Sequence, residues 1–128
     1  MASARTPILA DNAPSPKGPY VHAVVAGDLV LCGGQIGVDP ATGALAETVG
    51  AQATQALRNL DEVCRASGAR LADAAWMTLY LADLGDLAEV NAAYADFFGD
   101  QLPTRTTLQA AALVGGGRVC IDAIVVLS

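Results

Sequence analysis

The sequence predicts a mixed α+β fold in which two helices pack on one face of a β-sheet. Residues 48–67 and 86–99 repeat apolar side chains with a period of about 3.6 residues, as amphipathic helices do. Stretches typical of strands stand before, between and after them, with hairpins at both ends of the chain. This interleaving favours a mixed sheet, because a crossover helix joins parallel strands whereas a hairpin joins antiparallel ones.

The uncovered face of this sheet predicts an oligomer. The strands are apolar on both faces, although the two helices can cover only one of them. The chain is 53% hydrophobic and 16% charged, so it has little polar material for the surface of a monomer. We therefore expect subunits to bury this face against one another.

Length and composition define the folding unit. With 128 residues, the chain is expected to form a single domain over residues 1–128 with a substantial core. Aromatic residues make up only 5% of the chain, so small aliphatic side chains must fill that core. Residues 1–18 contain three prolines and no sustained period, which predicts an irregular lead-in.

Charge and cysteine content argue against several classes of protein. The net charge of −6 and seven unclustered basic residues disfavour a nucleic-acid partner, which Lys and Arg would have to hold. Three cysteines without C-x-x-C spacing support no disulfide framework and no zinc site, and they indicate a reducing compartment. No apolar run reaches about 18 residues and no signal-like segment opens the chain, so we expect a cytoplasmic protein without a membrane partner.

Residues 20–26 and 29–35 predict a hairpin with a tight turn between them. Gly33 and Gly34 interrupt the second strand. Consecutive glycines in a strand indicate either a β-bulge or a place where a ligand approaches the backbone, and both interpretations remain open. A turn follows at residues 39–43, where a proline and a glycine supply the required backbone angles.

Both helices carry end signals. Thr48 is placed to cap the first helix and Gly68 to stop it. Asp86 and Glu89 have the spacing of a capping box at the start of the second helix, which Gly99 ends.

The remaining stretches predict three more strands. They lie at residues 74–84, 104–111 and 119–127. The expected order of elements is therefore β β α β α β β.

Arg105 is the first candidate for a functional residue. It follows Pro103 in a threonine-rich extended run, so Arg105 and Thr107 should lie on one face of their strand. Asp122 lies on the polar face of the last strand. If the two strands are neighbours and their polar faces agree, an arginine fork and a carboxylate share one pocket, which suits a small anionic substrate. The alternative is a surface or ion-paired arginine.

Several separate blocks resemble the reactive intermediate deaminase family, also called the RidA or YjgF-like family. They occur in the same order and with similar spacing over nearly the whole chain, which makes the resemblance more specific than any single motif. The blocks are residues 13–20 (APSPKGPY), 33–36 (GGQI), 39–43 (DPATG), 55–60 (QALRNL), 90–98 (VNAAYADFF), 102–105 (LPTR) and 121–124 (IDAI).

The resemblance implies a chorismate-mutase-like α+β fold and a homotrimer. In that family the sheets of three subunits enclose a central barrel, and the three sites lie between subunits. Members of the deaminase type hydrolyse enamines and imines such as 2-aminoacrylate to 2-keto acids and ammonia. They use no metal and no cofactor.

The resemblance also implies roles for individual residues. Arg105 matches the arginine that binds the substrate carboxylate, and Tyr20 matches a site tyrosine that packs on the substrate. Asn91 matches an asparagine that supports the site, although a helical asparagine beside an apolar stripe is also a common structural amide. Asp122 matches the acidic residue that orients the attacking water.

Four positions depart from the family pattern. Gly33 stands where the deaminases usually have serine, Asp122 where they have glutamate, and Thr107 where a cysteine is frequent. His22 replaces a common glutamine, and it is either a structural histidine or a compensating acid or base. A catalytic group misplaced by about 1 Å can cost on the order of a hundredfold in rate, so these changes bear on activity.

Three functions fit this altered pocket. The first, which we favour, is a 2-iminobutanoate/2-iminopropanoate-type deaminase with backbone groups near Gly33 and Thr107 helping to orient the water. The second is a pathway-specific relative acting on a larger imine, enamine or carbonyl compound, because Gly33 and Asp122 both enlarge the pocket. The third is a non-catalytic trimer that binds a small molecule. Ribonuclease activity, also associated with the family, is disfavoured by the acidic charge.

Overall fold

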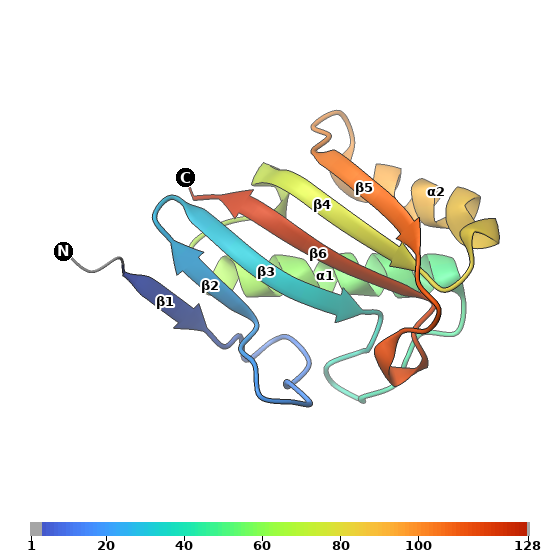
Figure 1. Ribbon diagram of the computed structural model, residues 1–128, viewed down its shortest axis with the longest axis horizontal. Helices are drawn as coiled ribbons and strands as arrows, with labels where there is room; N and C mark the ends of the chain where they lie inside the picture. The colour runs from blue at the N-terminus through green and yellow to red at the C-terminus, as the bar shows by residue number, and fades with distance from the viewer. Residues whose placement is uncertain (1–3, 128) are drawn as a thin grey trace.

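Six strands form one mixed sheet, and two α-helices pack behind it in the computed structural model, which describes residues 4–127 (Figure 1). The strands are β1 (Arg5–Ile8), β2 (Ala23–Ala26), β3 (Leu29–Ile36), β4 (Ala74–Leu81), β5 (Thr104–Gln109) and β6 (Val119–Val126). The helices are α1 (Val49–Ala66) and α2 (Leu87–Phe98), with short 3₁₀ turns at Leu71–Asp73, Leu84–Asp86 and Val114–Gly116.

The strand order is β1-β2-β3-β6-β4-β5. Helix α2 connects β4 to β5, and these two strands pair in parallel, whereas every other pairing in the sheet is antiparallel. This arrangement confirms the expected mixed sheet with two helices. It also leaves β5 as an edge strand beside α2, which is where Arg105 lies.

The core lies between the sheet and the helices. Met77, Leu79 and Leu81 of β4 and Ile121 of β6 are fully buried on that side. The alternate residues point to the opposite side, which no helix covers (Figure 1). This open face carries large exposed apolar side chains, with 39–48% of each accessible, at Leu29, Leu31, Trp76, Leu108 and Val126.

Part of the lead-in is a strand, which corrects the expectation of an irregular segment over residues 1–18. Strand β1 pairs with β2 along its whole length and forms the second edge of the sheet. Four residues are too short to show a period, and Pro7 argues against a strand except at an edge like this one.

His22 attaches the lead-in to the sheet. It is buried, its Nδ1 accepts a hydrogen bond from the Ala10 amide at 2.8 Å, and its Nε2 lies 2.7 Å from the Pro14 carbonyl oxygen, to which it donates. Its backbone amide bonds to the carbonyl of Ile8. The predicted strand over residues 20–26 begins only at Ala23, directly after His22, which is bonded to the lead-in.

The N-terminus of α1 is capped as predicted, whereas that of α2 is not. Thr48 accepts a hydrogen bond from the Ala51 amide at 3.1 Å. Asp86, however, lies in a 3₁₀ turn with helical backbone angles, which direct its carboxylate away from the helix amides and toward Arg118. Glu89 accepts from the amide of Gly50, so it caps α1 instead of α2.

Candidate functional site

The guanidinium of Arg105 is held by three neighbours. Its Nε donates to Thr107 Oγ1 at 2.9 Å and its Nη2 donates to Asn91 Oδ1 at 2.7 Å. Its Cζ lies 4.7 Å from the centre of the Tyr94 ring, a distance at which a cation is attracted to the ring face. Arg105 is thus fixed both within its plane and from one side.

The sequence produces this cluster through two local periods. Arg105 and Thr107 alternate onto the same face of β5, as predicted. Asn91 and Tyr94 are three residues apart and therefore share one face of α2. Because α2 leads directly into β5 through a short loop, these two faces meet at the edge of the sheet.

The bound guanidinium retains donors for a ligand. Of its five N–H groups, the contacts to Thr107 and Asn91 use two. Both N–H groups of Nη1 and one of Nη2 remain, which is enough for one bidentate contact with a carboxylate. Arg105 is half-buried and makes no ion pair within residues 4–127, so its positive charge is available to an anion.

Tyr94 is the member of this cluster that the sequence did not indicate. Its side chain is 95% buried and burial raises its pKa to about 12, although the charge of Arg105 acts in the opposite direction. Its position in the apolar stripe of α2 is the same as that of a core residue. A tyrosine one helical turn after an asparagine was the only available signal.

Asp122 does not lie beside Arg105 in the same chain, which corrects the expectation of a pocket shared through neighbouring strands. Strand β4 separates β5 from β6. In the sheet register, Arg105 pairs with Met77 and Asp122 pairs with Thr78. These two partners are consecutive residues of β4. Because consecutive residues of a strand point to opposite faces, Arg105 faces the helices and Asp122 faces the open side.

The open side carries a small polar group around Asp122. The hydroxyl of Tyr80 donates to Asp122 Oδ2 at 3.2 Å. The carboxylate charge raises the pKa of Tyr80, and burial followed by this charge raises the pKa of the Cys120 thiol to about 11. Asp122 is therefore an acceptor on a sheet face that is otherwise largely apolar.

Tyr20 and Gly33 lie toward the other edge of the sheet from Arg105. Tyr20 is 58% exposed in the loop before β2, and its hydroxyl accepts from the Lys17 amide at 3.3 Å. Strands β6 and β4 separate β3, which carries Gly33, from β5. The structure thus brings Asn91 and Thr107 to Arg105, but not Tyr20, Gly33 or Asp122.

The glycine pair lies in a β-bulge, which confirms one of the two interpretations offered for it. The register of β3 against β6 shifts between Cys32 and Gln35. A Cβ on Gly33 would meet only the His22 carbonyl oxygen, at 3.6 Å, so a side chain fits there. A Cβ on Gly34 would lie 2.7 Å from Cys120 Sγ, which disfavours a side chain at that position.

His22 is a structural histidine. Both ring nitrogens are engaged by backbone groups, and its side chain is 97% buried. These bonds fix the neutral tautomer with the proton on Nε2, because Nδ1 must accept from the Ala10 amide. The ring therefore has no nitrogen left for acid or base chemistry.

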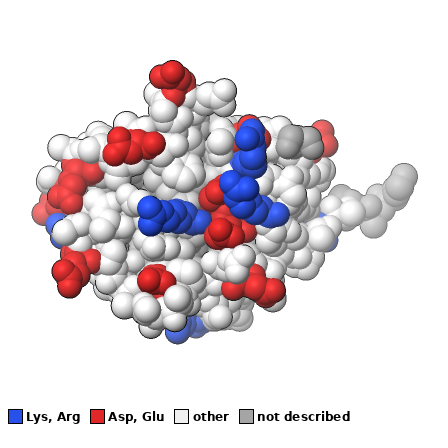
Figure 2. Space-filling model, turned by 180° about the vertical axis from the view of Figure 1, so that it is seen from behind, with Lys and Arg blue, Asp and Glu red and all other residues white. Residues whose placement is uncertain are grey.

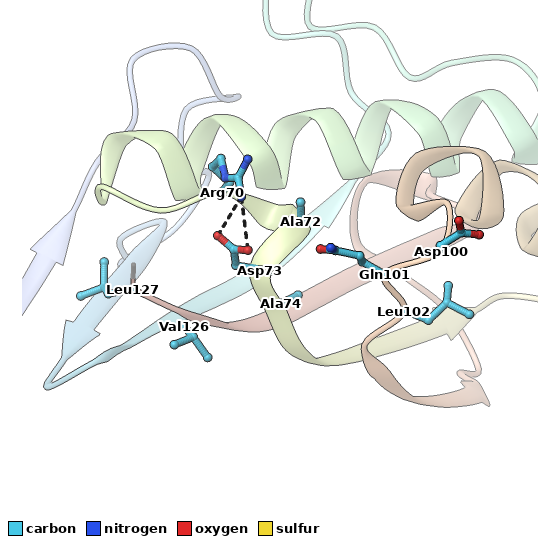
Figure 3. Close-up of a pocket in the computed structure, with 9 residues that line it drawn as sticks. All are labelled: Arg70, Ala72, Asp73, Ala74, Asp100, Gln101, Leu102, Val126 and Leu127. Atoms are coloured by element: carbon cyan, nitrogen blue, oxygen red, sulfur yellow. Dashed lines mark hydrogen bonds and ion pairs between the residues drawn. The ribbon is translucent and has the colours of Figure 1, made fainter.

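One depression on the surface lies away from this cluster. It has a volume of about 650 Å³ and lies where β4 begins and β6 ends (Figure 3). Arg70 and Asp73 form an ion pair across part of it at 3.4 Å (Figure 3). Its lining contains none of the residues predicted for the site.

The charges on the helix side are mixed. Figure 2 shows acidic and basic side chains interspersed over the face seen from behind the view of Figure 1, without a continuous basic stripe. Arg65 pairs with Asp61 within α1, and Arg70 pairs with Asp73 in the 3₁₀ turn that follows α1. In the described part of the chain, no helix is long and apolar enough to cross a membrane.

Comparison with known proteins places this architecture in a family. The profile described as Endoribonuclease L-PSP matches residues 10–127. The chain is 42% identical to the 2-iminobutanoate/2-iminopropanoate deaminase of Salmonella typhimurium over 93% of its own length and 95% of that protein. It is also 43% identical to Protein DfrA of Myxococcus xanthus, covering 96% of each chain.

Solved structures agree with these sequence matches. The structure of TdcF from Escherichia coli with bound serine superposes with a TM-score of 0.92 at 36% identity, covering 96% of this chain and 99% of that one. The YjgF gene product of the same species gives a TM-score of 0.91 at 37% identity over 94% and 98% of the two chains. Because the family profile covers residues 10–127 and the solved structures share the fold, this chain belongs to the Endoribonuclease L-PSP family, the YjgF-like or RidA family that its sequence resembles.

Proposed function

We propose that this protein hydrolyses reactive 2-imino acids and their enamine tautomers to 2-keto acids and ammonia. The observation that carries the proposal is the fixed guanidinium of Arg105, which keeps three N–H donors for a substrate carboxylate. A relative 42% identical to this chain carries the name 2-iminobutanoate/2-iminopropanoate deaminase. The structure of TdcF holds serine, a small amino acid with the same carboxylate group.

The reaction needs little from the protein beyond binding and orientation. Arg105 binds the substrate carboxylate, which is attached to the carbon of the C=N bond, and stabilises the negative charge of that carboxylate. Water adds to the imine carbon while Asp122 accepts a hydrogen bond from it, a proton passes to the nitrogen, and ammonia leaves as the C=O bond forms. We propose no metal and no cofactor for this hydrolysis.

The site proposed for this reaction lies between subunits of a homotrimer. Arg105 and Asp122 face opposite sides of one sheet, so a common pocket requires that they come from different chains. The open face carries enough exposed apolar surface to favour such an assembly, including Leu31 and Trp76. In this arrangement Asn91 and Thr107 accompany Arg105, while Tyr20, Gly33 and Asp122 belong to the neighbouring subunit.

A small-molecule substrate fits the charge of the molecule better than RNA does, even though the family profile carries the name of an endoribonuclease. The net charge is −6, and on the face of Figure 2 the few basic side chains lie next to acidic ones. We also propose a cytoplasmic location. The cysteines at 32, 64 and 120 are all free thiols, which suits a reducing compartment.

The direct test is the release of ammonia and keto acid from 2-aminoacrylate generated in the assay by a pyridoxal-phosphate dehydratase. The wild type should accelerate both, and Arg105→Ala should lose at least about a hundredfold in kcat/KM, because the carboxylate loses its bidentate partner. Arg118→Ala is the matched control, since this exposed arginine pairs with Asp86 outside the cluster. The proposal fails if the wild type matches the uncatalysed rate.

A second candidate is hydrolysis of a larger imine or a related carbonyl compound. It is favoured by the open space at Gly33, where a Cβ would meet only one atom within 4 Å. If it is correct, a bulky imino acid should be turned over faster than 2-aminoacrylate. The double change Gly33→Ser with Asp122→Glu should then reverse this preference. Binding of either compound without ammonia release would indicate a non-catalytic trimer.

A further inference from the structure

We propose that Tyr94 is a positioning residue for Arg105, and that its ring face sets the plane in which the guanidinium receives a carboxylate. The proposal rests on the imine hydrolase function for its kinetic consequence. Tyr94 would not touch the substrate itself. It acts through Arg105.

The contacts of Arg105 divide into two kinds. Thr107 and Asn91 bind N–H groups within the guanidinium plane, and neither prevents the group from rocking about the line that joins them. The Cζ of Arg105 lies over the face of the Tyr94 ring, 4.7 Å from the ring centre, so this contact comes from outside that line. Among the described residues, this contact with the Tyr94 ring is the one that opposes rotation of the guanidinium about that line.

The ring is itself rigidly held. Phe98 packs against it with ring centres 4.7 Å apart, and Phe97 packs edge-on against Phe98 at 5.0 Å. Tyr94 and Phe98 are both buried, one turn apart on α2. Phe98 therefore supports the Tyr94 ring from the core side of α2.

The surroundings of the Tyr94 hydroxyl indicate that the aromatic ring, and not the hydroxyl, positions Arg105. Its oxygen is buried and has no hydrogen-bond partner among residues 4–127. A buried hydroxyl without a partner costs stability. The ring face, by contrast, has a specific partner in Arg105. Phenylalanine presents a similar face to a cation, so the positioning function should survive loss of the hydroxyl.

The consequence is a separation of KM from kcat. A fixed guanidinium lowers the cost of ordering Arg105 when the carboxylate binds, which acts on substrate and transition state alike. Tyr94→Leu should raise KM for a 2-imino acid about tenfold while kcat falls by less than about threefold. Tyr94→Phe should restore KM to within about twofold of the wild type.

Phe97→Leu is the matched control. It removes an aromatic ring from the same helix, yet Phe97 contacts Phe98 and not Arg105. Its KM should stay near that of the wild type. An equal rise of KM in Tyr94→Leu and Phe97→Leu would overturn the proposal, and so would failure of Tyr94→Phe to restore KM.

A second measurement does not depend on turnover. In ¹H–¹⁵N spectra, the Arg105 Nε–H should be protected from exchange and shifted by the ring current of Tyr94. Tyr94→Leu should abolish the shift and Tyr94→Phe should keep it. If the wild type has no deaminase activity but the shift behaves in this way, the proposed function fails and the positioning function stands. An unchanged signal in Tyr94→Leu overturns the positioning function.

Discussion

Arg105 and Asp122 face opposite sides of the same sheet, although both are proposed to act on one substrate. The register through β4 fixes this relationship, since their partners Met77 and Thr78 are adjacent in that strand. If the proposed function is correct, a single chain carries two incomplete halves of the site. One half would have Arg105 beside α2 to bind the carboxylate, and the other would have Asp122 on the open face to accept a hydrogen bond from water.

Tyr94→Phe should stabilise the protein at neutral pH by up to about 1 kcal/mol, because it removes a buried hydroxyl that lacks a partner. The difference between the two proteins should grow in alkali. The pKa of Tyr94 is raised from 10.0 to about 12 in the folded state, so the unfolded wild type loses its proton first. Wild-type stability therefore falls relative to the variant as pH rises from about 10 toward 12, by up to roughly 2–3 kcal/mol.

Urea unfolding at pH 8 and pH 11 measures this effect. Other groups titrate in both proteins, so the difference between the wild type and Tyr94→Phe isolates Tyr94. A difference that is independent of pH would contradict the burial of its hydroxyl.

Gly37→Ala should destabilise the fold by about 3 kcal/mol or more. A Cβ at this position would collide with backbone atoms of Gln52 in α1, which cannot move without shifting the helix. Gly33→Ala is the matched control, because its Cβ would find ordinary contact at 3.6 Å. Thermal unfolding of both variants should show a large loss of Tm for Gly37→Ala alone. Similar losses in both would refute the close approach of Gly37, just after β3, to α1.

Cys120 should be alkylated at least about a hundredfold more slowly at pH 7 than an exposed cysteine, because a pKa of about 11 leaves very little thiolate. Burial is the larger cause of the raised pKa and the charge of Asp122 is the smaller. The rate should therefore increase up to about pH 11, and Asp122→Asn should accelerate it severalfold at neutral pH. Mass spectrometry of the labelled peptide would detect rapid labelling at pH 7, which would count against this environment for Cys120.

The sequence predicts best what is local. The helical period and end signals of α1 correspond to Val49–Ala66 with Thr48 as its cap. The alternation of Arg105 and Thr107 onto one face is likewise confirmed by their hydrogen bond. These features depend on residues within a few positions of one another, so the local sequence pattern is enough to predict them.

The predictions that were wrong or missing concern tertiary structure. Alternation assigns Asp122 to one face of its own strand, but it cannot relate that face to the one that carries Arg105, because β4 lies between. Strand β1 is too short to show a period and exists through its pairing with β2. Tyr94 was missed because a tyrosine under an arginine and a core tyrosine produce the same apolar stripe.

Mixed oligomers test the central claim most directly. Arg105→Ala and Asp122→Ala subunits, each inactive alone, are co-expressed with different tags, and assemblies that carry both tags are purified. If each site takes Arg105 from one subunit and Asp122 from its neighbour, every mixed trimer has one intact site and should show about one third of wild-type deaminase activity. Mixed assemblies as inactive as their parents would contradict a site shared between subunits.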